Sequence, residues 1–470
     1  ILLKKFIGFS IGPVIGSIIS FITIPLTTFF VKPDEFGKAS MFSLFQSVIT
    51  TFLYLGLDQS YTREYHETND KENLFKTSII IPLLISLLIF IVICFNLNTF
   101  SILLFGSSGY NIATLLFGLI IIFTVIERFV LLSIRMKENA LEYSIVNIVL
   151  KLSVLIFTLF FVLFIRRDFL AVVYSVAFGQ IFTDIYLVGK YRKYLNFRNF
   201  FFDKVLFIRL LKFGFPLVIA ASINNLLHSL DRITLRVWSD FYEIGVFTAA
   251  LKISSVLLIV QSSFTSFWVP VAYRWYSQNK DIKYYELVSK IVLFAMSFLF
   301  CLMLLFKDFI IKLLGNDYAD AKFIIALLCL YPVMYTLSET TTLGITFSRK
   351  SYYNIWVSLF SIIPNLILNY LLIPSYGAVG AAVGTGVAYI IFFLARSYFS
   401  NKNWVGFSLK PHVFLSLFLL VVALINTQDI KNITLINFGF LLVIVVFQIT
   451  TLKQIINIYR GKDNQVWDFS

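Results

Sequence analysis

Long runs of apolar residues, separated by short polar connections, recur along the whole chain. Fourteen runs are long enough to cross a membrane as helices, which takes about 20 residues each. Within lipid the backbone must satisfy its own hydrogen bonds, and these runs are too long for the strands of a barrel. The pattern therefore predicts an all-helical, polytopic membrane protein. Its predicted segments lie near residues 6–31, 38–60, 77–95, 111–132, 143–165, 169–189, 213–236, 242–268, 286–306, 319–345, 352–373, 377–399, 411–427 and 432–452.

The chain also contains an internal repeat. Leu-Leu-Lys at 210–212 matches the same tripeptide at 2–4, and Glu-x-Gly at 243–245 matches 35–37, both at an offset of 208 residues. Because six crossings are an even number, both copies enter the membrane from the same side, which predicts a pseudo-two-fold axis along the membrane normal. We expect three parts: a six-helix bundle in residues 1–195, a second in 196–405, and two further helices with a cytoplasmic tail in 406–470.

Composition agrees with a membrane protein, since 59% of residues are hydrophobic, 14% are charged and the mean hydropathy is +0.86. The net charge of +14 could suggest nucleic-acid binding. However, most of the 39 Lys and Arg residues fall on alternate connections, and we count Arg128 and Arg396 among these. This bias is typical of cytoplasmic loops, so we expect both termini in the cytoplasm and no nucleic-acid partner.

Signatures of catalysis and of metal binding are missing from the sequence. The cysteines Cys94, Cys301 and Cys329 lie in apolar runs and are expected to be buried thiols. The three histidines do not form a metal-binding spacing, and no phosphate-binding glycine loop with its lysine occurs. Residues 1–31 are expected to be a membrane segment and not a cleavable signal peptide. We predict no metal, no cofactor and no enzymatic activity.

Polar side chains are unusual at membrane depth, and they concentrate in residues 212–252 and near residues 58–63. Ionisable groups there cost several kcal/mol unless they are paired or face water, which makes them functional candidates. The candidates for binding a substrate are Arg63, Asn224, Asn225, Arg232, Arg236, Lys252 and Gln261. The candidates for coupling to an ion are Asp58, Asp231 and His228, and Asp184 and Glu339 are further carboxylates in or near the membrane.

Each candidate also has a structural interpretation. Arg63 can be a positive-inside residue, and Arg232 and Arg236 can anchor a helix at the interface. Lys252 can be the partner of Asp231 or Asp58, and the asparagines can join helices by hydrogen bonds. Lys151 and Asp184 are expected to form a structural pair. Trp268 is favoured as an aromatic of the membrane interface, and a place in the substrate site is the alternative.

Several short motifs follow one another in an order and spacing that resemble a known family. They are Gly12-Pro13, Leu55–Asp58 followed by Arg63–Tyr65, Phe215-Pro216, Asp231-Arg232, Ile244–Phe247 with Lys252, Gly315–Tyr318 and Tyr376–Ala382. With the fourteen predicted segments, they make the chain similar to the polysaccharide flippases. These are the Wzx-type O-antigen and capsule exporters of the multidrug/oligosaccharidyl-lipid/polysaccharide (MOP) exporter superfamily. The resemblance covers essentially the whole chain.

The resemblance implies a two-bundle transporter that moves undecaprenyl-pyrophosphate-linked oligosaccharides from the inner to the outer leaflet of a bacterial inner membrane. Its implied partners are the lipid-linked oligosaccharide, membrane lipids, a coupling H+ or Na+, a polysaccharide polymerase and a chain-length regulator, and a monomer is expected. Lipid II flippases and drug or cation antiporters of the same superfamily are alternatives. A membrane polysaccharide polymerase or ligase is a further alternative, but those enzymes typically carry a long outer loop that this chain lacks.

Overall fold

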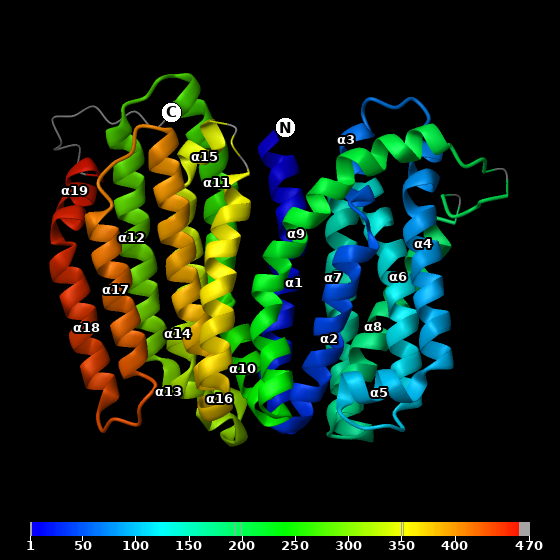
Figure 1. Cartoon of the computed structure of the whole chain (residues 1–470), viewed down its shortest axis with the longest axis horizontal. Coiled ribbons are helices and arrows are strands. Elements are labelled where there is room, and N and C mark those ends of the chain that lie inside the picture. Colours follow the sequence, from blue (N-terminus) through cyan, green and yellow to red (C-terminus); the bar gives the residue numbers. More distant parts are fainter. Residues whose placement is uncertain (1, 193, 199, 349, 351, 460–470) are drawn as a thin grey trace. The chain divides into compact units, whose positions relative to one another are not determined.

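The computed structural model describes residues 2–192, 194–198, 200–348, 350 and 352–459, without the side chains of 2–10, 219–221, 223–224, 455, 458 and 459. Within these ranges the chain is almost entirely helical (Figure 1). In chain order the helices are α1 (Leu2–Phe30), α2 (Pro33–Leu53), α3 (Leu57–Glu64), α4 (Lys71–Phe95), α5 (Leu97–Phe105), α6 (Asn111–Met136), α7 (Ala140–Phe160), η1 (Phe161–Ile165), α8 (Phe169–Lys190), α9 (Lys204–Trp238), α10 (Phe241–Ser254), α11 (Val256–Ser277), α12 (Ile282–Leu305), α13 (Lys307–Leu314), η2 (Asn316–Phe323), α14 (Ile325–Thr341), α15 (Leu343–Phe347), α16 (Tyr353–Asn403), α17 (Lys410–Ile425), α18 (Ile433–Phe447) and α19 (Ile449–Tyr459).

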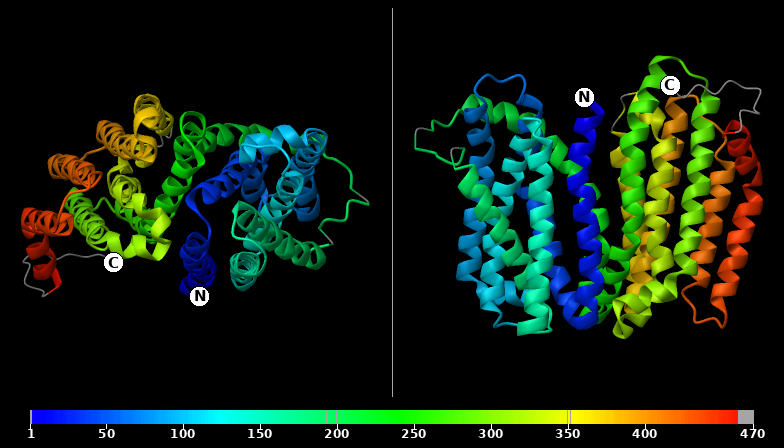
Figure 2. Two further views of the ribbon diagram at one scale, coloured as in Figure 1. Left: turned by 90° about the horizontal axis from the view of Figure 1, so that it is seen from below. Right: turned by 180° about the vertical axis from the view of Figure 1, so that it is seen from behind.

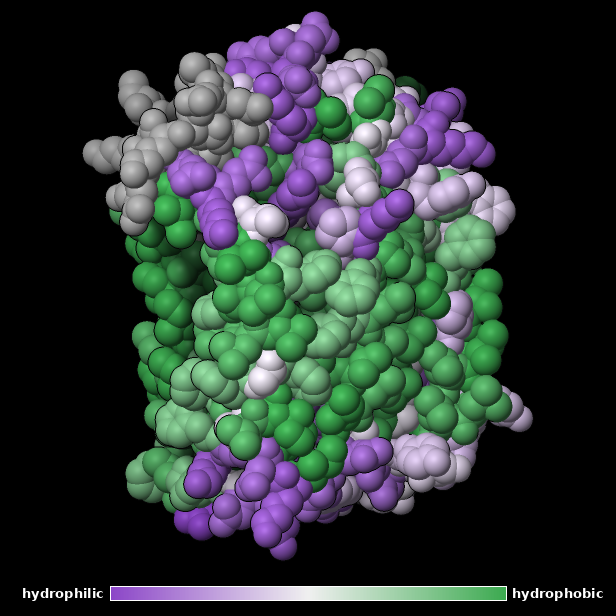
Figure 3. All heavy atoms as spheres, turned by 90° about the vertical axis from the view of Figure 1, so that its left-hand side faces the viewer, coloured by the Kyte–Doolittle hydropathy of each residue, from purple (hydrophilic) through white to green (hydrophobic). Residues whose placement is uncertain are grey.

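These helices have the length and composition of membrane spans. In the described ranges eight can cross a membrane, or ten if each of two bent helix pairs counts as one crossing. Figure 3, which views the side of Figure 1 where α17–α19 lie, shows a hydrophobic band between hydrophilic ends. Large apolar side chains are exposed on α17 and α18, among them Leu417, Val421, Leu442, Val443 and Val446. Such a surface is stable in lipid and not in water.

Each predicted segment overlaps a helix of the structure, although several segments are bent. The segment 38–60 is α2 and α3, which meet at 54°, and the segment 319–345 begins with η2 and α14, which meet at 56°. The segments 352–373 and 377–399 form one long helix, α16, which breaks at Gly377 (φ 51°, ψ −127°). The all-helical membrane fold is therefore confirmed, while the count of fourteen crossings stays a prediction.

Contacts divide the chain into two compact units, which we describe separately. The first contains residues 1–236 and 240–248, and the second contains 237–239 and 249–470. The predicted division at residues 195 and 405 stays a prediction.

In the first unit α1 packs along α7, and α6 lies between α4 and α8 (Figures 1 and 2). Its core is rich in aromatic side chains, including Phe42, Phe75, Phe117 and Phe129. Helix α9 belongs to this unit because its first half contacts α3: the Ser60 hydroxyl donates to the carbonyl of Leu210 at 2.6 Å.

In the second unit α14 packs against α11, α12 and α16, and α12 packs against α18. A smaller aromatic cluster there contains Trp268, Trp275 and Tyr285, all of which are fully buried.

Within the first unit, residues that correspond in the repeat touch each other. The hydroxyl of Thr248 lies 3.3 Å from that of Ser40, its counterpart at the offset of 208. Nearby, a Cβ on Gly37 would lie 3.0 Å from the backbone nitrogen of Gly245, again its counterpart. A residue can meet its own counterpart only near a symmetry axis. Corresponding residues of the internal repeat therefore contact each other where the start of α2 meets the start of α10.

This contact predicts a strong sensitivity to added volume. A Cβ on Gly37 would lie 1.9 Å from the carbonyl oxygen of Phe241, and one on Gly245 would lie 1.8 Å from that of Pro33. Because both obstacles are backbone atoms, we expect Gly37→Ala and Gly245→Ala each to destabilise the fold by about 1–3 kcal/mol. Thermal unfolding of the detergent-purified protein measures this effect.

The matched control is Gly439→Ala in α18, where nothing lies within 4 Å of an added Cβ. Its unfolding midpoint should stay unchanged or rise, since alanine favours a helix over glycine by about 1 kcal/mol. An equal change in the unfolding midpoint for all three variants would contradict the close packing at Gly37 and Gly245.

Candidate functional site

Asp58 lies at the start of the short helix α3, just after a sharp break in the chain. Leu55 (φ 51°) and Gly56 (φ 72°) both adopt the left-handed region, which ends α2 and turns the chain into α3. The carboxylate of Asp58 is buried, with 6% of the residue exposed. Its Oδ2 accepts hydrogen bonds from Nη2 of Arg128 at 2.6 Å and from Nε at 3.1 Å. The buried charge is thus neutralised by an arginine of α6.

Arg63 lies at the other end of α3 and is exposed. Its guanidinium sits over the ring of Phe213 in α9, 4.1 Å from the ring centroid. The two helices approach closely because glycines face each other: a Cβ on Gly56 would lie 2.1 Å from the carbonyl oxygen of Gly214. The arginine is therefore held by its flat face, which leaves its N–H edges available for an anion.

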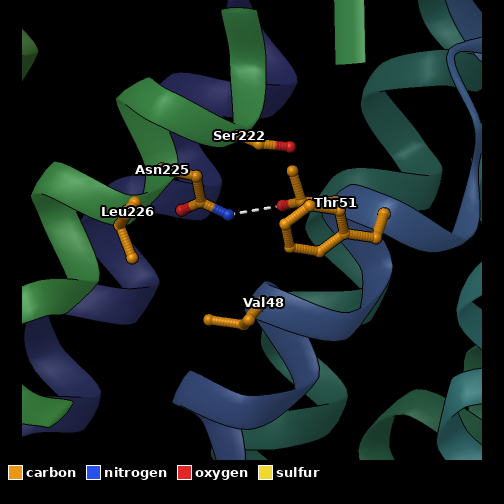
Figure 4. A pocket seen from close by; sticks show the side chains of 6 residues that line it. Val48, Thr51, Ser222, Asn225 and Leu226 are labelled. Carbon is orange, nitrogen blue, oxygen red and sulfur yellow. Dashed lines mark hydrogen bonds between the residues drawn. The ribbon is translucent and has the colours of Figure 1, made fainter. Parts of the chain in front are cut away.

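A pocket of about 140 Å³ lies between α2 and α9, and Asn225 lines it from α9 (Figure 4). The amide nitrogen of Asn225 donates to the hydroxyl of Thr51 and, at 3.4 Å, to the carbonyl of Ser47. The rest of the lining is mainly apolar and comprises Val48, Thr51, Phe52, Ser222 and Leu226. The side chain of Asn224 lies outside the described residues.

Further along α9, the candidates His228, Asp231 and Arg232 lie on adjacent turns. Asp231 is buried, and Arg232 lies within electrostatic range of both Asp231 and His228. The next candidate, Arg236, packs its guanidinium over the ring of Phe241, 4.4 Å from the centroid. Its Nη2 also donates to the carbonyl of Ile102, at 3.4 Å.

The remaining two candidates belong to the second unit. Lys252 lies on α10 and is exposed, and Gln261 lies on α11, where its amide donates to the hydroxyl of Thr265 at 2.9 Å. Trp268, which the sequence favoured as an aromatic of the membrane interface and allowed as a platform for a sugar, does not offer its ring to a ligand in this structure. Its ring is fully buried, and its Nε1 donates to the carbonyl of Glu339 at 3.2 Å.

Two arginines that we counted as loop residues lie inside helices and pair with buried acids. Arg128 is in α6 and binds Asp58, and Arg396 is in α16, where Nη1 donates to Glu339 at 2.7 Å. Assigning them to cytoplasmic connections was wrong, because hydropathy does not reveal a partner 57 or 70 residues away in sequence. The adjacent charges Glu127 and Arg128 within an apolar run were the signal that could have identified the first pair.

The expected pair of Lys151 and Asp184 is also corrected. Lys151 is exposed, whereas Asp184 is fully buried. The partner of Asp184 is the amide of Gln180, which donates to its Oδ2 at 2.8 Å. The same amide nitrogen donates to Glu127. Sequence reasoning missed Glu127 and Gln180.

The ion pair of Asp58 and Arg128 predicts a measurable coupling energy. Because Asp58 is buried while the Arg128 side chain is 40% exposed, we expect a moderate value of about 1–3 kcal/mol. A double-mutant cycle with Asp58→Asn and Arg128→Gln, followed by thermal unfolding, measures it. The combined variant should recover part of the stability that each single variant loses.

The control cycle uses Glu286→Gln and Lys290→Gln, an i,i+4 pair at 2.8 Å with both side chains about a third exposed. Exposed helical pairs contribute only about 0.3–0.5 kcal/mol. A coupling energy no larger for Asp58 and Arg128 than for this pair would refute the structural role of the buried pair.

Comparisons with known proteins agree with this architecture. The sequence model of the family described as "Polysaccharide biosynthesis protein" matches residues 2–276. The chain is 23% identical over 420 residues to the capsular polysaccharide biosynthesis protein CapF of Staphylococcus aureus, which covers 85% of this chain and 100% of that relative. It is 21% identical over 226 residues to the probable low-salt glycan biosynthesis flippase Agl15 of Haloferax volcanii. This alignment covers 47% of this chain and 47% of that relative.

Solved structures share the fold. The lipid II flippase MurJ in an inward closed conformation matches with a TM-score of 0.72 at 18% identity, over 95% of this chain and 99% of that chain. An inward-facing multidrug transporter of the MATE family in the MOP superfamily matches with a TM-score of 0.63 at 14% identity, over 85% and 98%. At these identities the similarity establishes the fold alone.

Proposed function

This chain belongs to the polysaccharide biosynthesis protein family, and from that premise we propose that it is a flippase for lipid-linked oligosaccharides. The observation that carries the proposal is the family match over residues 2–276. Relatives named for capsular polysaccharide biosynthesis and for glycan flipping support it, as does the fold shared with a lipid II flippase. The cargo we propose is an undecaprenyl-pyrophosphate-linked repeat unit, carried from the inner to the outer leaflet of a bacterial inner membrane by alternating access.

A pyrophosphate carries negative charge and needs cations in a site that water can reach. We assign its binding to Arg63, Arg232, Arg236 and Lys252, because arginine N–H edges bind phosphate oxygens in pairs and lysine adds a point charge. Arg63 offers support for this assignment, since its ring contact with Phe213 holds the guanidinium in place. The hydroxyls of the sugar would be bound by the amides of Asn224, Asn225 and Gln261.

Coupling to H+ or Na+ through Asp58, Asp231 and His228 belongs to the same proposal. Asp58 is already paired with Arg128, so it would act by exchanging this partner during the cycle. We further propose that the chain forms two six-helix bundles with two additional helices. It acts as a monomer with both termini in the cytoplasm. It cooperates with a polysaccharide polymerase and a chain-length regulator. The proposed activity is transport without chemical conversion of the cargo.

The second candidate is a drug or cation antiporter, which the fold shared with MATE transporters favours. The two candidates differ in the charge that the cargo requires. An anionic cargo requires cationic side chains, and a cationic drug requires acidic ones. Among the candidate residues Arg63, Arg232, Arg236 and Lys252 outnumber Asp58 and Asp231, which favours the anion.

Genetic complementation tests the proposal. The gene is placed in a bacterium that lacks its own repeat-unit flippase, and surface polysaccharide is quantified. We expect rescue by the wild type, and about tenfold or greater loss of surface polysaccharide with Arg63→Ala or Lys252→Ala, because a charge-assisted contact contributes about 1.5–3 kcal/mol.

The control is Lys402→Ala, which removes an exposed cation near the end of α16 and should leave rescue intact. All variants must reach the membrane in equal amounts. Rescue that persists in both Arg63→Ala and Lys252→Ala would refute the assignment of pyrophosphate binding to these cations. Export of a cationic dye by a wild type that cannot flip purified lipid-linked oligosaccharide would favour the antiporter.

A further inference from the structure

Two carboxylates of the first unit share one amide group inside the helix bundle. The amide nitrogen of Gln180 donates to Oδ2 of Asp184 at 2.8 Å and also to Oε2 of Glu127. Asp184 and Gln180 lie one turn apart on α8, and Glu127 faces them from α6. A close contact fixes this part of α8, since a Cβ on Gly179 would lie 2.8 Å from backbone atoms of Val154 in α7.

The surroundings of Asp184 favour a neutral acid over a carboxylate. The residue is fully buried, and within the described part of the chain its Oδ1 has no hydrogen-bond partner. Burying a carboxylate anion with one oxygen that accepts no hydrogen bond costs much desolvation free energy in a low-dielectric interior. Burying a neutral carboxyl group costs much less. A second carboxylate on the same amide raises the cost of ionising both.

The charges around the pair balance when one proton is bound. Arg128, the neighbour of Glu127 on α6, is occupied by Asp58 of α3. Lys151 of α7 lies within electrostatic range of Glu127, and Tyr54 lies within electrostatic range of both Glu127 and Asp184. Two anions against Lys151 leave one negative charge in excess, and a single proton removes it.

The second repeat indicates that the fold does not need these carboxylates. At the offset of 208, Glu127 corresponds to Tyr335, Gln180 to Ala388 and Asp184 to Phe392. In the second unit the rings of Tyr335 and Phe392 stack with centroids 5.6 Å apart. The same positions therefore meet in both repeats, once through a polar group that can titrate and once through aromatic packing.

We propose that Glu127, Gln180 and Asp184 form a proton-binding site that couples transport to a proton gradient. Asp184 holds the proton, and Glu127, which is only partly buried, exchanges it with water; one proton binds and the same proton is released. A proton fits better than a metal cation, because hard cations take six or more oxygen ligands. In the described residues no group of three His, Cys, Asp or Glu side chains lies close enough to hold one. The coupling role rests on the proposed flippase function, whereas the binding of the proton does not.

Infrared difference spectroscopy of the purified full-length protein, titrated with pH, tests proton binding directly. We expect a C=O stretching band of a protonated carboxyl group at neutral pH that disappears on alkalinisation. Asp184→Asn should remove the band at neutral pH, and Glu127→Gln with Asp184→Asn should remove it throughout the neutral and alkaline range, where exposed carboxyl groups are ionised. Glu339→Gln is the matched control, because this carboxylate is also buried but is paired with Arg396 in the second unit, and it should leave the band unchanged.

A wild type without the band, or a band that survives in the double variant, would overturn the site. Should the double variant not be recovered as folded protein, the single Asp184→Asn variant gives the same answer at neutral pH.

Proteoliposomes containing the same variants test coupling. A gradient of one pH unit is a tenfold difference in proton activity, so it should change the extent of wild-type flipping of lipid-linked oligosaccharide by up to about tenfold. In the double variant the gradient should have no effect. Equal dependence in both, or dependence on a sodium gradient alone, would overturn proton coupling through this site. A wild type that shows the infrared band but flips nothing under any gradient would instead refute the proposed flippase function, with the proton site intact.

Discussion

A charge inside a membrane protein must find its partner within the protein, because lipid offers none. The rest of the first unit depends on this constraint. Asp58 is buried between α3 and α6, where its Oδ2 accepts from two N–H groups of Arg128 and, at 3.3 Å, from the amide of Gln59. The break at Leu55 and Gly56 directs Asp58 toward Arg128 at the cost of two left-handed residues. The same requirement acts in the second unit, where Arg396 neutralises Glu339.

Close approach of helices is the second constraint, and glycines provide it. In lipid there is no hydrophobic driving force between helices, so association depends on tight packing and hydrogen bonds. Gly56 and Gly214 let α3 and α9 meet at their backbones, and the Ser60 hydroxyl then reaches the carbonyl of Leu210. Gly37 and Gly245 do the same for α2 and α10, where the two repeats meet their own counterparts.

The two repeats share a fold but differ in chemistry. The first carries carboxylates at Glu127 and Asp184, and the second carries the stacked rings of Tyr335 and Phe392 at the corresponding positions. A repeat that needs only packing can fill these positions with apolar groups, whereas one that responds to an ion needs groups that titrate. The same architecture can therefore carry different chemistry in its two copies, which suits a transporter whose two halves have different tasks.

Sequence by itself determined the all-helical membrane fold and the approximate positions of its helices, because lipid forces apolar runs of about 20 residues into helices. Its ordered motifs also indicated the family. It also located the polar stretch of α9 from Asn225 to Arg236. The tertiary structure decided which charges meet. Arg128 and Arg396 looked like loop residues, Lys151 looked like the partner of Asp184, and Gln180 attracted no attention. Hydropathy measures the cost of each side chain separately, whereas a partner 53 or 70 residues away is decided by which faces of two helices pack together.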